Sequence, residues 1–342
     1  MNSDHLDKWI GRRKERRENF SLVSLFTLLI QGDITVLSTC LTVLESTRTD
    51  DQVLAKQLIE SALPLSGNSI RIGITGVPGV GKSTFIESFG KLLTDQGHKV
   101  AVLAIDPSSS ENGGSILGDK TRMTELSVNP KVFIRPTAAG ATLGGVARKT
   151  RESIYLCEAA GFDVILIETV GVGQSETYVH SMVDFFLLLM LSGAGDELQG
   201  IKRGIMEMAD ALVITKADGD NEMKSKIAAT AYKNAIHLFP PKKSNWIVPV
   251  LTCSSINNSG MQEVNKSIEG FSITTKANGW FAEHRKIQDS FWLKETLRDK
   301  ILNEFFGDEK WLAALEQQEK MVYEGAISSF QAADNLYKQF KG

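Results

Sequence analysis

A phosphate-loop pattern constrains the fold of this chain more than any other stretch of its sequence. The segment GITGVPGVGKST, Gly73 to Thr84, follows an apolar run and opens an amphipathic helical stretch. A strand that turns sharply into a helix lets backbone N–H groups converge on phosphate oxygens, and the helix dipole favours negative charge there. Lys82 is expected to reach the β and γ phosphates, and Ser83 to place its hydroxyl on Mg²⁺. The predicted nucleotide-binding residues of this loop are Gly76, Val77, Pro78, Gly79, Val80, Gly81, Lys82, Ser83 and Thr84.

Short apolar runs alternate with longer amphipathic stretches from Ser69 onwards. The runs are IRIGIT, KVAVLAID, KVFIRPT, DVILIET, FFLLLML, ALVIT and WIVPVLT. Continuous rather than alternating apolarity is typical of strands covered on both faces, as in a parallel sheet with helices on each side. The sequence therefore predicts an α/β fold, in which a phosphate-loop domain contains a doubly wound, mostly parallel sheet.

Helical segments are predicted on both sides of this domain. Residues 1–65 show helical periodicity and form a predicted N-terminal extension, residues 66–272 form the nucleotide domain, and residues 273–342 form a helical C-terminal arm. Apolar side chains recur on one side of Trp280 to Phe306, and a second helical stretch is expected from about Asp308 to Phe340. The arm carries large aromatic side chains that it cannot bury alone. They fit either docking onto the sheet domain or self-association.

The base is expected to be read where two later strands end. The run ALVIT ends in TKAD, Thr215 to Asp218, and the next run is followed by TCSSI. The Asp218 carboxylate can accept from both N1–H and the exocyclic amine of guanine, whereas adenine offers an N1 acceptor, so guanine is preferred. The usual first residue of this motif is Asn, and Thr215 puts the tethering of the loop in question. The predicted base-side residues are Thr215, Lys216, Asp218, Ser254, Ser255 and Ile256.

Several carboxylates are placed to hold a phosphate-bound cation. Asp106 and Glu168 each end an apolar run, and Asp119 lies in the glycine-rich segment GGSILGDKTRM. With Ser83 they make a set of hard oxygen donors suited to Mg²⁺. Lys82, Asp106 and Glu168 are the predicted catalytic residues, and the Gly171 N–H is expected near the γ-phosphate.

The position after Gly171 predicts slow unaided hydrolysis. In Ras-like switches a Gln there orients the attacking water, but this chain has Val172. Gln174, two residues further, is the alternative for that role.

Composition excludes several other classes. Lys and Arg total 38 against 41 Asp and Glu, so no basic footprint for nucleic acid is present. The three cysteines are far apart, which argues against a zinc site or a disulfide framework and favours a reducing, cytoplasmic location. The longest apolar run, Phe185 to Leu191, is far shorter than the roughly 20 residues of a membrane span.

These motifs together resemble the MeaB/ArgK-like (MMAA) G-protein chaperone family of methylmalonyl-CoA mutase. The resemblance rests on LTVLES, RIGITGVPGVGKST, LAIDPSSS, GGSILGDKTRM, ATLGGVARKTRE, IETVGVGQSE and GAGDELQGIKRGIMEMAD. It implies a GTPase with GTP/GDP and Mg²⁺ as cofactors. Its partner would be an adenosylcobalamin-dependent acyl-CoA mutase, whose cofactor loading, protection and reactivation it gates.

The resemblance also assigns roles outside the phosphate loop. GDELQGIKRG resembles the third switch of the family, and Lys202 within it resembles the lysine that couples nucleotide state to the partner. Family members are homodimers through C-terminal helices, which favours the self-association interpretation of the arm. Two alternatives stay open: a phosphotransferase linked to basic-amino-acid transport, and a nickel-insertion GTPase.

Overall fold

A seven-stranded parallel sheet organises the chain, in the order β3-β2-β4-β1-β5-β6-β7. The computed structural model describes residues 21–105, 123–136, 143–169, 175–193 and 203–341. The strands are β1 (Ile70–Gly76), β2 (Val100–Ile105), β3 (Val132–Pro136), β4 (Val164–Thr169), β5 (Phe185–Met190), β6 (Ala211–Ile214) and β7 (Val250–Thr252). Each lies in one of the apolar runs of the sequence, so the predicted parallel α/β sheet is confirmed.

The direction of winding of the sheet changes at β1. From β1 the chain fills the positions of β2, β3 and β4 on one side, and then those of β5, β6 and β7 on the other. In open α/β sheets, ligands bind outside the carboxyl ends of the strands where the winding reverses. The phosphate loop follows β1 at that point.

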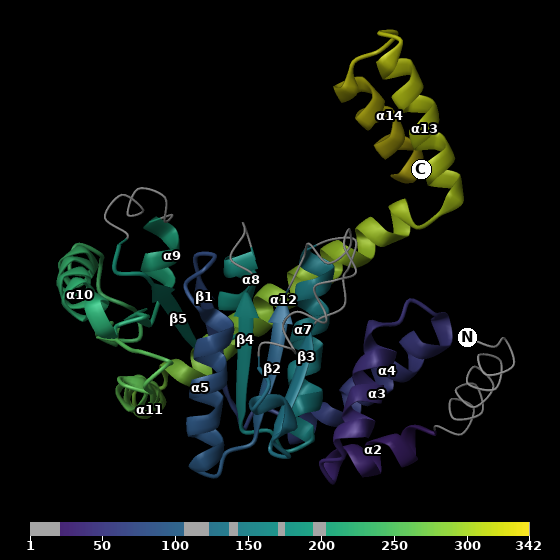
Figure 1. The fold of residues 1–342 in the computed structure, drawn as a ribbon. Helices are drawn as coiled ribbons and strands as arrows, with labels where there is room; N and C mark the ends of the chain where they lie inside the picture. The colour runs from purple at the N-terminus through teal and green to yellow at the C-terminus, as the bar shows by residue number, and fades with distance from the viewer. Residues whose placement is uncertain (1–20, 106–122, 137–142, 170–174, 194–202, 342) are drawn as a thin grey trace, which may run out of the picture. The chain divides into compact units, whose positions relative to one another are not determined.

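Helices cover both faces of the sheet (Figure 1). Helices α5 (Lys82–Asp95) and α11 (Met261–Ala277) share one face, on which Phe85 and Phe89 stack and Phe271 packs against Phe185. The other face carries α7 (Leu143–Ala159), α8 (Ser175–His180), α9 (Arg203–Met208) and α10 (Glu222–Ile236). Alternate residues of β5 serve the two faces: Leu187 and Leu189 face α5 and α11, whereas Leu188 and Met190 face α10.

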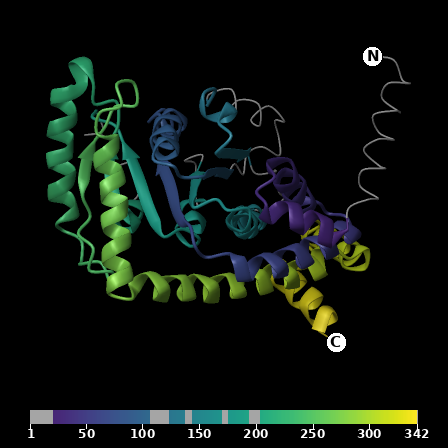
Figure 2. The ribbon, with the colours of Figure 1, turned by 90° about the horizontal axis from the view of Figure 1, so that it is seen from below.

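Three N-terminal helices pack beside α7 (Figure 2). They are α2 (Leu22–Ile30), α3 (Ile34–Glu45) and α4 (Thr49–Ala62). The Arg135 guanidinium at the end of β3 forms a bidentate ion pair with Glu45 of α3, and Lys149 of α7 donates to the Leu44 carbonyl at 2.9 Å. Helix α3 is thereby fixed to both the sheet and α7.

The end of the chain is helical. The described residues form two compact units, which divide between Lys286 and Ile287. Helix α12 (Trp280–Phe306) has the expected bounds, but the second expected stretch is two helices, α13 (Glu309–Tyr323) and α14 (Ser329–Lys341). Gly325, with φ +71°, lies in the turn between them, a left-handed conformation that ends a helix readily. Phe305, Trp311 and Phe340 pack together as a small core of the second unit.

A buried charge network lies at the amino end of the sheet. Arg71 of β1 donates to both Glu158 oxygens. Burial lowers the pKa of Arg71, but the negative charges of Glu158 and Asp184 together outweigh burial, so the pKa is raised. Arg285, near the start of α12, donates to both oxygens of Asp184 at 2.7 Å. These paired charges connect α7, β1, β5 and the start of α12.

Two histidines lie against each other close to this network. The ring centroid of His180, at the end of α8, is 6.0 Å from that of His284 and 5.6 Å from that of Phe186. Burial, followed by the charge of His284, lowers the pKa of His180 to about 4. Burial also lowers the pKa of His284. Both rings are therefore held in their neutral forms at pH 7.

Candidate nucleotide site

The phosphate loop has the backbone conformation that its glycines predict. It joins β1 to α5, and Gly79 and Gly81 have φ values of +80° and +93°, where a side chain is strained. A Cβ on Gly76 would lie 2.5 Å from the carbonyl oxygen of Leu189 on the neighbouring strand. The loop therefore needs glycine for its turns and for its close approach to β5. Its N–H groups lead into the N-terminus of α5, where an anion is stabilised.

The Lys82 ammonium lies over the loop. Its Nζ donates to the Gly76 carbonyl at 2.9 Å and to the Val77 carbonyl at 3.4 Å. As the first residue of α5, Lys82 places a positive charge at a helix N-terminus that already favours negative ligands. This position fits its predicted contact with phosphates.

Two hard oxygen donors meet beside the loop. Ser83 Oγ donates to Glu168 Oε1 at 3.4 Å, and Glu168, in β4, is only 6% exposed. A hydroxyl and a carboxylate are ligands that Mg²⁺ accepts, so these residues fit the predicted metal position. Asp106, Asp119, Gly171 and Lys202 lie outside the described residues, as do Val172 and Gln174.

Thr215 ties the base-binding segment to the phosphate loop. Its side chain is buried, and its hydroxyl lies 2.7 Å from the Val80 carbonyl and 3.2 Å from the Met190 carbonyl. The sequence raised the question whether a Thr in place of the usual Asn could tether the loop. The geometry answers it, because the shorter side chain still reaches a loop carbonyl.

Lys216 makes a second connection to the loop. Its Nζ donates to the Gly79 carbonyl at 2.7 Å, and its own φ of +55° is uncommon for a residue with a side chain. Asn221 donates to the Lys216 carbonyl at 2.7 Å and accepts from Ser192 Oγ at 2.6 Å. The Asn221 side chain, itself held by Ser192, thus supports the unusual backbone conformation of Lys216.

The predicted base-reading carboxylate is held by the next loop. Ser254 Oγ donates to Asp218 Oδ2. The Ser254 Oγ also accepts from the Ile256 N–H at 3.2 Å. The backbone reinforces this contact, because the Ala217 N–H donates to the Cys253 carbonyl at 3.0 Å. Ser254 is completely buried, whereas the Ile256 side chain is 83% exposed. The two sequence motifs are therefore joined in space around Asp218.

A hydrogen bond from Ser88 connects the second base-side loop to α5. Ser88 of α5 donates to the Ser255 carbonyl at 2.9 Å, so the second base-side loop is fixed to the helix that follows the phosphate loop. Phosphate loop, TKAD segment, TCSSI segment and α5 thus form a closed cycle of hydrogen bonds. The sequence did not single out Ser88, Ser192 or Asn221, because isolated polar residues carry no motif.

This arrangement fits a phosphate-loop GTPase: a glycine loop with its Lys and Ser, and a fixed carboxylate that is predicted to read a purine base. Similarity to known sequences identifies the group within that class. A family model described as "Methylmalonyl Co-A mutase-associated GTPase MeaB" matches residues 37–310. The chain belongs to the MeaB family of GTPases, and guanine nucleotide is its ligand.

Named relatives agree with this assignment. A "Putative GTPase" of Caulobacter vibrioides is 50% identical over 93% of this chain and 97% of its own length. "GTPase ArgK" of Escherichia coli is 47% identical over 82% of this chain and 85% of its length. The mouse "Methylmalonic aciduria type A homolog, mitochondrial" is 43% identical over 93% of this chain and 79% of its length.

A solved structure shares the fold. The "Crystal structure of LAO/AO transport system kinase" superposes with a TM-score of 0.74 at 37% identity, covering 94% of this chain and 98% of that one. That name belongs to the other protein. No observation on this chain favours the phosphotransferase alternative.

The described residues contain no group of three or more His, Cys, Asp or Glu side chains that could hold a metal ion. Cys40, Cys157 and Cys253 are buried, and burial raises the pKa of Cys40 and Cys253 to about 12. No observation therefore favours the nickel-insertion alternative. Among the helices that the structure describes, none has the length and apolar content to cross a membrane.

Proposed function

We propose that this chain is a Mg²⁺-dependent GTPase that serves as a chaperone of an adenosylcobalamin-dependent acyl-CoA mutase, with methylmalonyl-CoA mutase as the expected partner. It would gate the loading of the mutase cofactor, protect the enzyme and help to reactivate it, in the cytoplasm. The description of the matching family, which names association with that mutase, carries this proposal.

The chain's own groups divide the work of nucleotide binding. Backbone N–H groups of the phosphate loop and the Lys82 ammonium hold the β and γ phosphates, and the Asp218 carboxylate accepts from the guanine edge. Ser83 and Glu168 would hold Mg²⁺, with Asp106 and Asp119 as the further expected donors. The cation supplies charge that offsets the negative charge of the transferring phosphoryl group. Gly171 would contact the γ-phosphate, and Val172 in the following position is the reason to expect slow hydrolysis without a partner.

Lys202 is the proposed connection between nucleotide state and mutase. It belongs to the segment that leads directly into α9, whose first residue is Arg203. Helix α9 in turn precedes β6, which ends at the base-reading motif. A change at the nucleotide can therefore reach the partner through a short stretch of chain.

We also propose that the C-terminal arm, residues 273–342, makes a homodimer, as one of three parts with the extension 1–65 and the nucleotide domain 66–272. The second compact unit supports this, because α12 exposes apolar side chains at helical spacing. These are Ile287, Phe291, Leu293, Leu297, Ile301, Leu302 and Phe306, each between 37% and 70% exposed. Leu297→Glu combined with Ile301→Glu should give a monomer in light scattering with chromatography, and an unchanged mass would contradict the proposal.

The chaperone role is tested by measuring nucleotide affinity and phosphate release with and without purified mutase. Because linked equilibria are reciprocal, a mutase that prefers one nucleotide state must change the affinity for that nucleotide, by roughly 5- to 150-fold in typical cases. If saturating mutase changes neither quantity, the chaperone role is wrong. Transfer of labelled γ-phosphate to an acceptor, instead of its release, would support the phosphotransferase alternative.

A further inference from the structure

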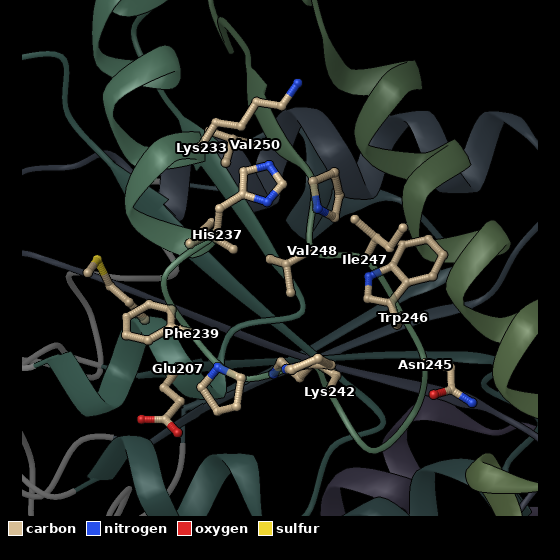
Figure 3. Close-up of a pocket in the computed structure, with 15 residues that line it drawn as sticks. Glu207, Lys233, His237, Phe239, Lys242, Asn245, Trp246, Ile247, Val248 and Val250 are labelled. Carbon is tan, nitrogen blue, oxygen red and sulfur yellow. The ribbon is translucent and has the colours of Figure 1, made fainter.

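A concave site lies away from the phosphate loop. It is a hollow of about 640 Å³ between the end of α10, the long irregular segment from His237 to Pro249, and α9 (Figure 3). The hollow is lined by Val250, the first residue of β7. Its wall residues Lys242 and Trp246 donate to Asp210, which directly precedes β6. Since the strands are parallel, the hollow is at the amino end of the sheet and the phosphate loop is at the carboxyl end.

The interior of the hollow is apolar. Its apolar lining residues are Met206, Ile236, Phe239, Pro240, Pro241, Trp246, Ile247, Val248, Pro249 and Val250. Ile247 on its rim and the neighbouring Leu238 are each 82% exposed. Apolar side chains that gather around a concavity mark an interaction site more often than scattered ones do. The volume is within the range of sites that receive a side-chain cluster or a small ligand.

Charge is distributed unevenly around the rim. Lys233 and His237 lie together on one side of the hollow in Figure 3, and Glu207 lies at another side next to Phe239. Glu207 is the single acidic residue of the lining, whereas the Lys242 ammonium is engaged by the Met208 carbonyl and Asp210. The Lys233 side of the rim therefore complements a carboxylate.

The walls are held in place before anything binds. Trp246 Nε1 donates to the Asp210 carbonyl at 2.9 Å, and Asn278 Nδ2 donates to the Ser244 carbonyl at 2.8 Å. Three prolines, Pro240, Pro241 and Pro249, restrict the backbone of the segment. Long irregular segments in compact domains are usually functional, and a site ordered in advance binds without an ordering cost.

The same hollow touches the helix that follows the proposed coupling segment. Met206 and Glu207 of α9 form one wall, and Lys242 Nζ donates to the Met208 carbonyl at the end of α9 at 2.9 Å. At the start of α9, the Arg203 guanidinium lies 5.5 Å from the ring centroid of Phe239, another wall residue. An occupant of the hollow would therefore contact both ends of α9 directly or through one residue.

We propose that the hollow docks a segment of the partner mutase that carries an apolar anchor residue beside a carboxylate. The anchor fills the space over Val248, the carboxylate pairs with Lys233, and the contact with α9 reports occupancy to the segment that contains Lys202. This inference rests on the proposed function, because the occupant is the mutase.

Two variants test the hollow and two matched variants control for them. Lys233→Glu reverses the rim charge, and Ile247→Asp places a charge on the apolar rim. Lys224→Glu and Ile227→Asp make the same changes at exposed positions of α10 that do not line the hollow. Mutase affinity is measured by calorimetry with GDP and with a non-hydrolysable GTP analogue, and GTP hydrolysis without mutase shows that each variant is folded.

Both hollow variants should weaken mutase binding at least tenfold, with the controls within twofold of the wild type and unaided hydrolysis unchanged in all four. Equal binding by wild type and hollow variants would overturn the docking site while leaving the proposed function intact. A wild type that does not bind the mutase overturns both. If the hollow variants instead lose self-association in light scattering, the occupant is a second copy of this chain and the proposal is wrong.

Discussion

Replacing Thr215 by Val removes the tether between base-binding segment and phosphate loop without changing the shape of the side chain. Thr215 is 3% exposed, and its hydroxyl lies 2.7 Å from the Val80 carbonyl. A buried carbonyl that loses its donor costs about 1–3 kcal/mol. The loop conformation that binds phosphate loses that much stability relative to other loop conformations, and GTP affinity falls to the extent that the free loop adopts them, by at most about 150-fold.

The assay is calorimetric titration of GTP and GDP into wild type, Thr215→Val, Thr215→Ser and Thr230→Val. Thr215→Ser keeps the hydroxyl and should bind within a few-fold of the wild type. Thr230 is an exposed residue of α10 whose hydroxyl bonds only to the Lys226 carbonyl of its own helix, so Thr230→Val controls for the loss of a hydroxyl. If Thr215→Val binds GTP as tightly as Thr230→Val, the Thr215 hydroxyl does not support the binding conformation of the loop.

Three further variants probe the site and its surroundings. Lys82→Ala should nearly abolish triphosphate binding and turnover in a phosphate-release assay, because it removes the positive charge beside the phosphate loop. The circular dichroism spectrum should stay native, and retained turnover would contradict the role of Lys82. Ser254→Ala frees the Asp218 carboxylate and should reduce the preference for GTP over ITP about tenfold, a loss of about 1.4 kcal/mol, in competition binding; an unchanged ratio would show that Asp218 is positioned by other groups. The folded pKa of His180, about 4, is below its unfolded value of 6.5, so the unfolded chain binds the proton more tightly and stability falls as pH drops through this window. Urea unfolding should show that wild type loses about 2 kcal/mol more between pH 7 and pH 5 than His180→Phe does, and equal losses would mean that His180 is not held neutral.

The sheet could be predicted from the sequence because each strand is buried on both faces and so appears as a continuous apolar run. FFLLLML, for example, became the fully buried strand β5 (Phe185–Met190). Helix α12 was also predictable from its apolar spacing. The division of the last helical stretch was missed, because the helical pattern continues on both sides of Gly325. The signal is local: the left-handed φ of Gly325 and the bond from the Ala326 N–H to the Met321 carbonyl end α13 within its own turn.

The residues of the candidate site could be predicted where they belong to a local sequence motif. The sequence gives the order of the phosphate loop, Asp218 and Ser254, but the hydrogen bond between the last two joins segments that lie 36 residues apart. The tether from Thr215 depends on a distance to Val80 that no pattern encodes. The hollow beside Lys233 arises from α9, α10 and the segment between α10 and β7, so periodicity within any one of them does not indicate it.

Asp218 is proposed to read guanine beside the phosphate loop, and the Asp218→Asn variant tests this role. Guanine presents two donors to the carboxylate, whereas xanthine has a carbonyl in place of the exocyclic amine and suits an amide that donates. Competition binding of GTP, ATP and XTP to wild type and variant is the measurement. We expect the wild type to select GTP and the variant to shift its preference to XTP. A variant that keeps the wild-type preference for GTP would contradict this role of Asp218.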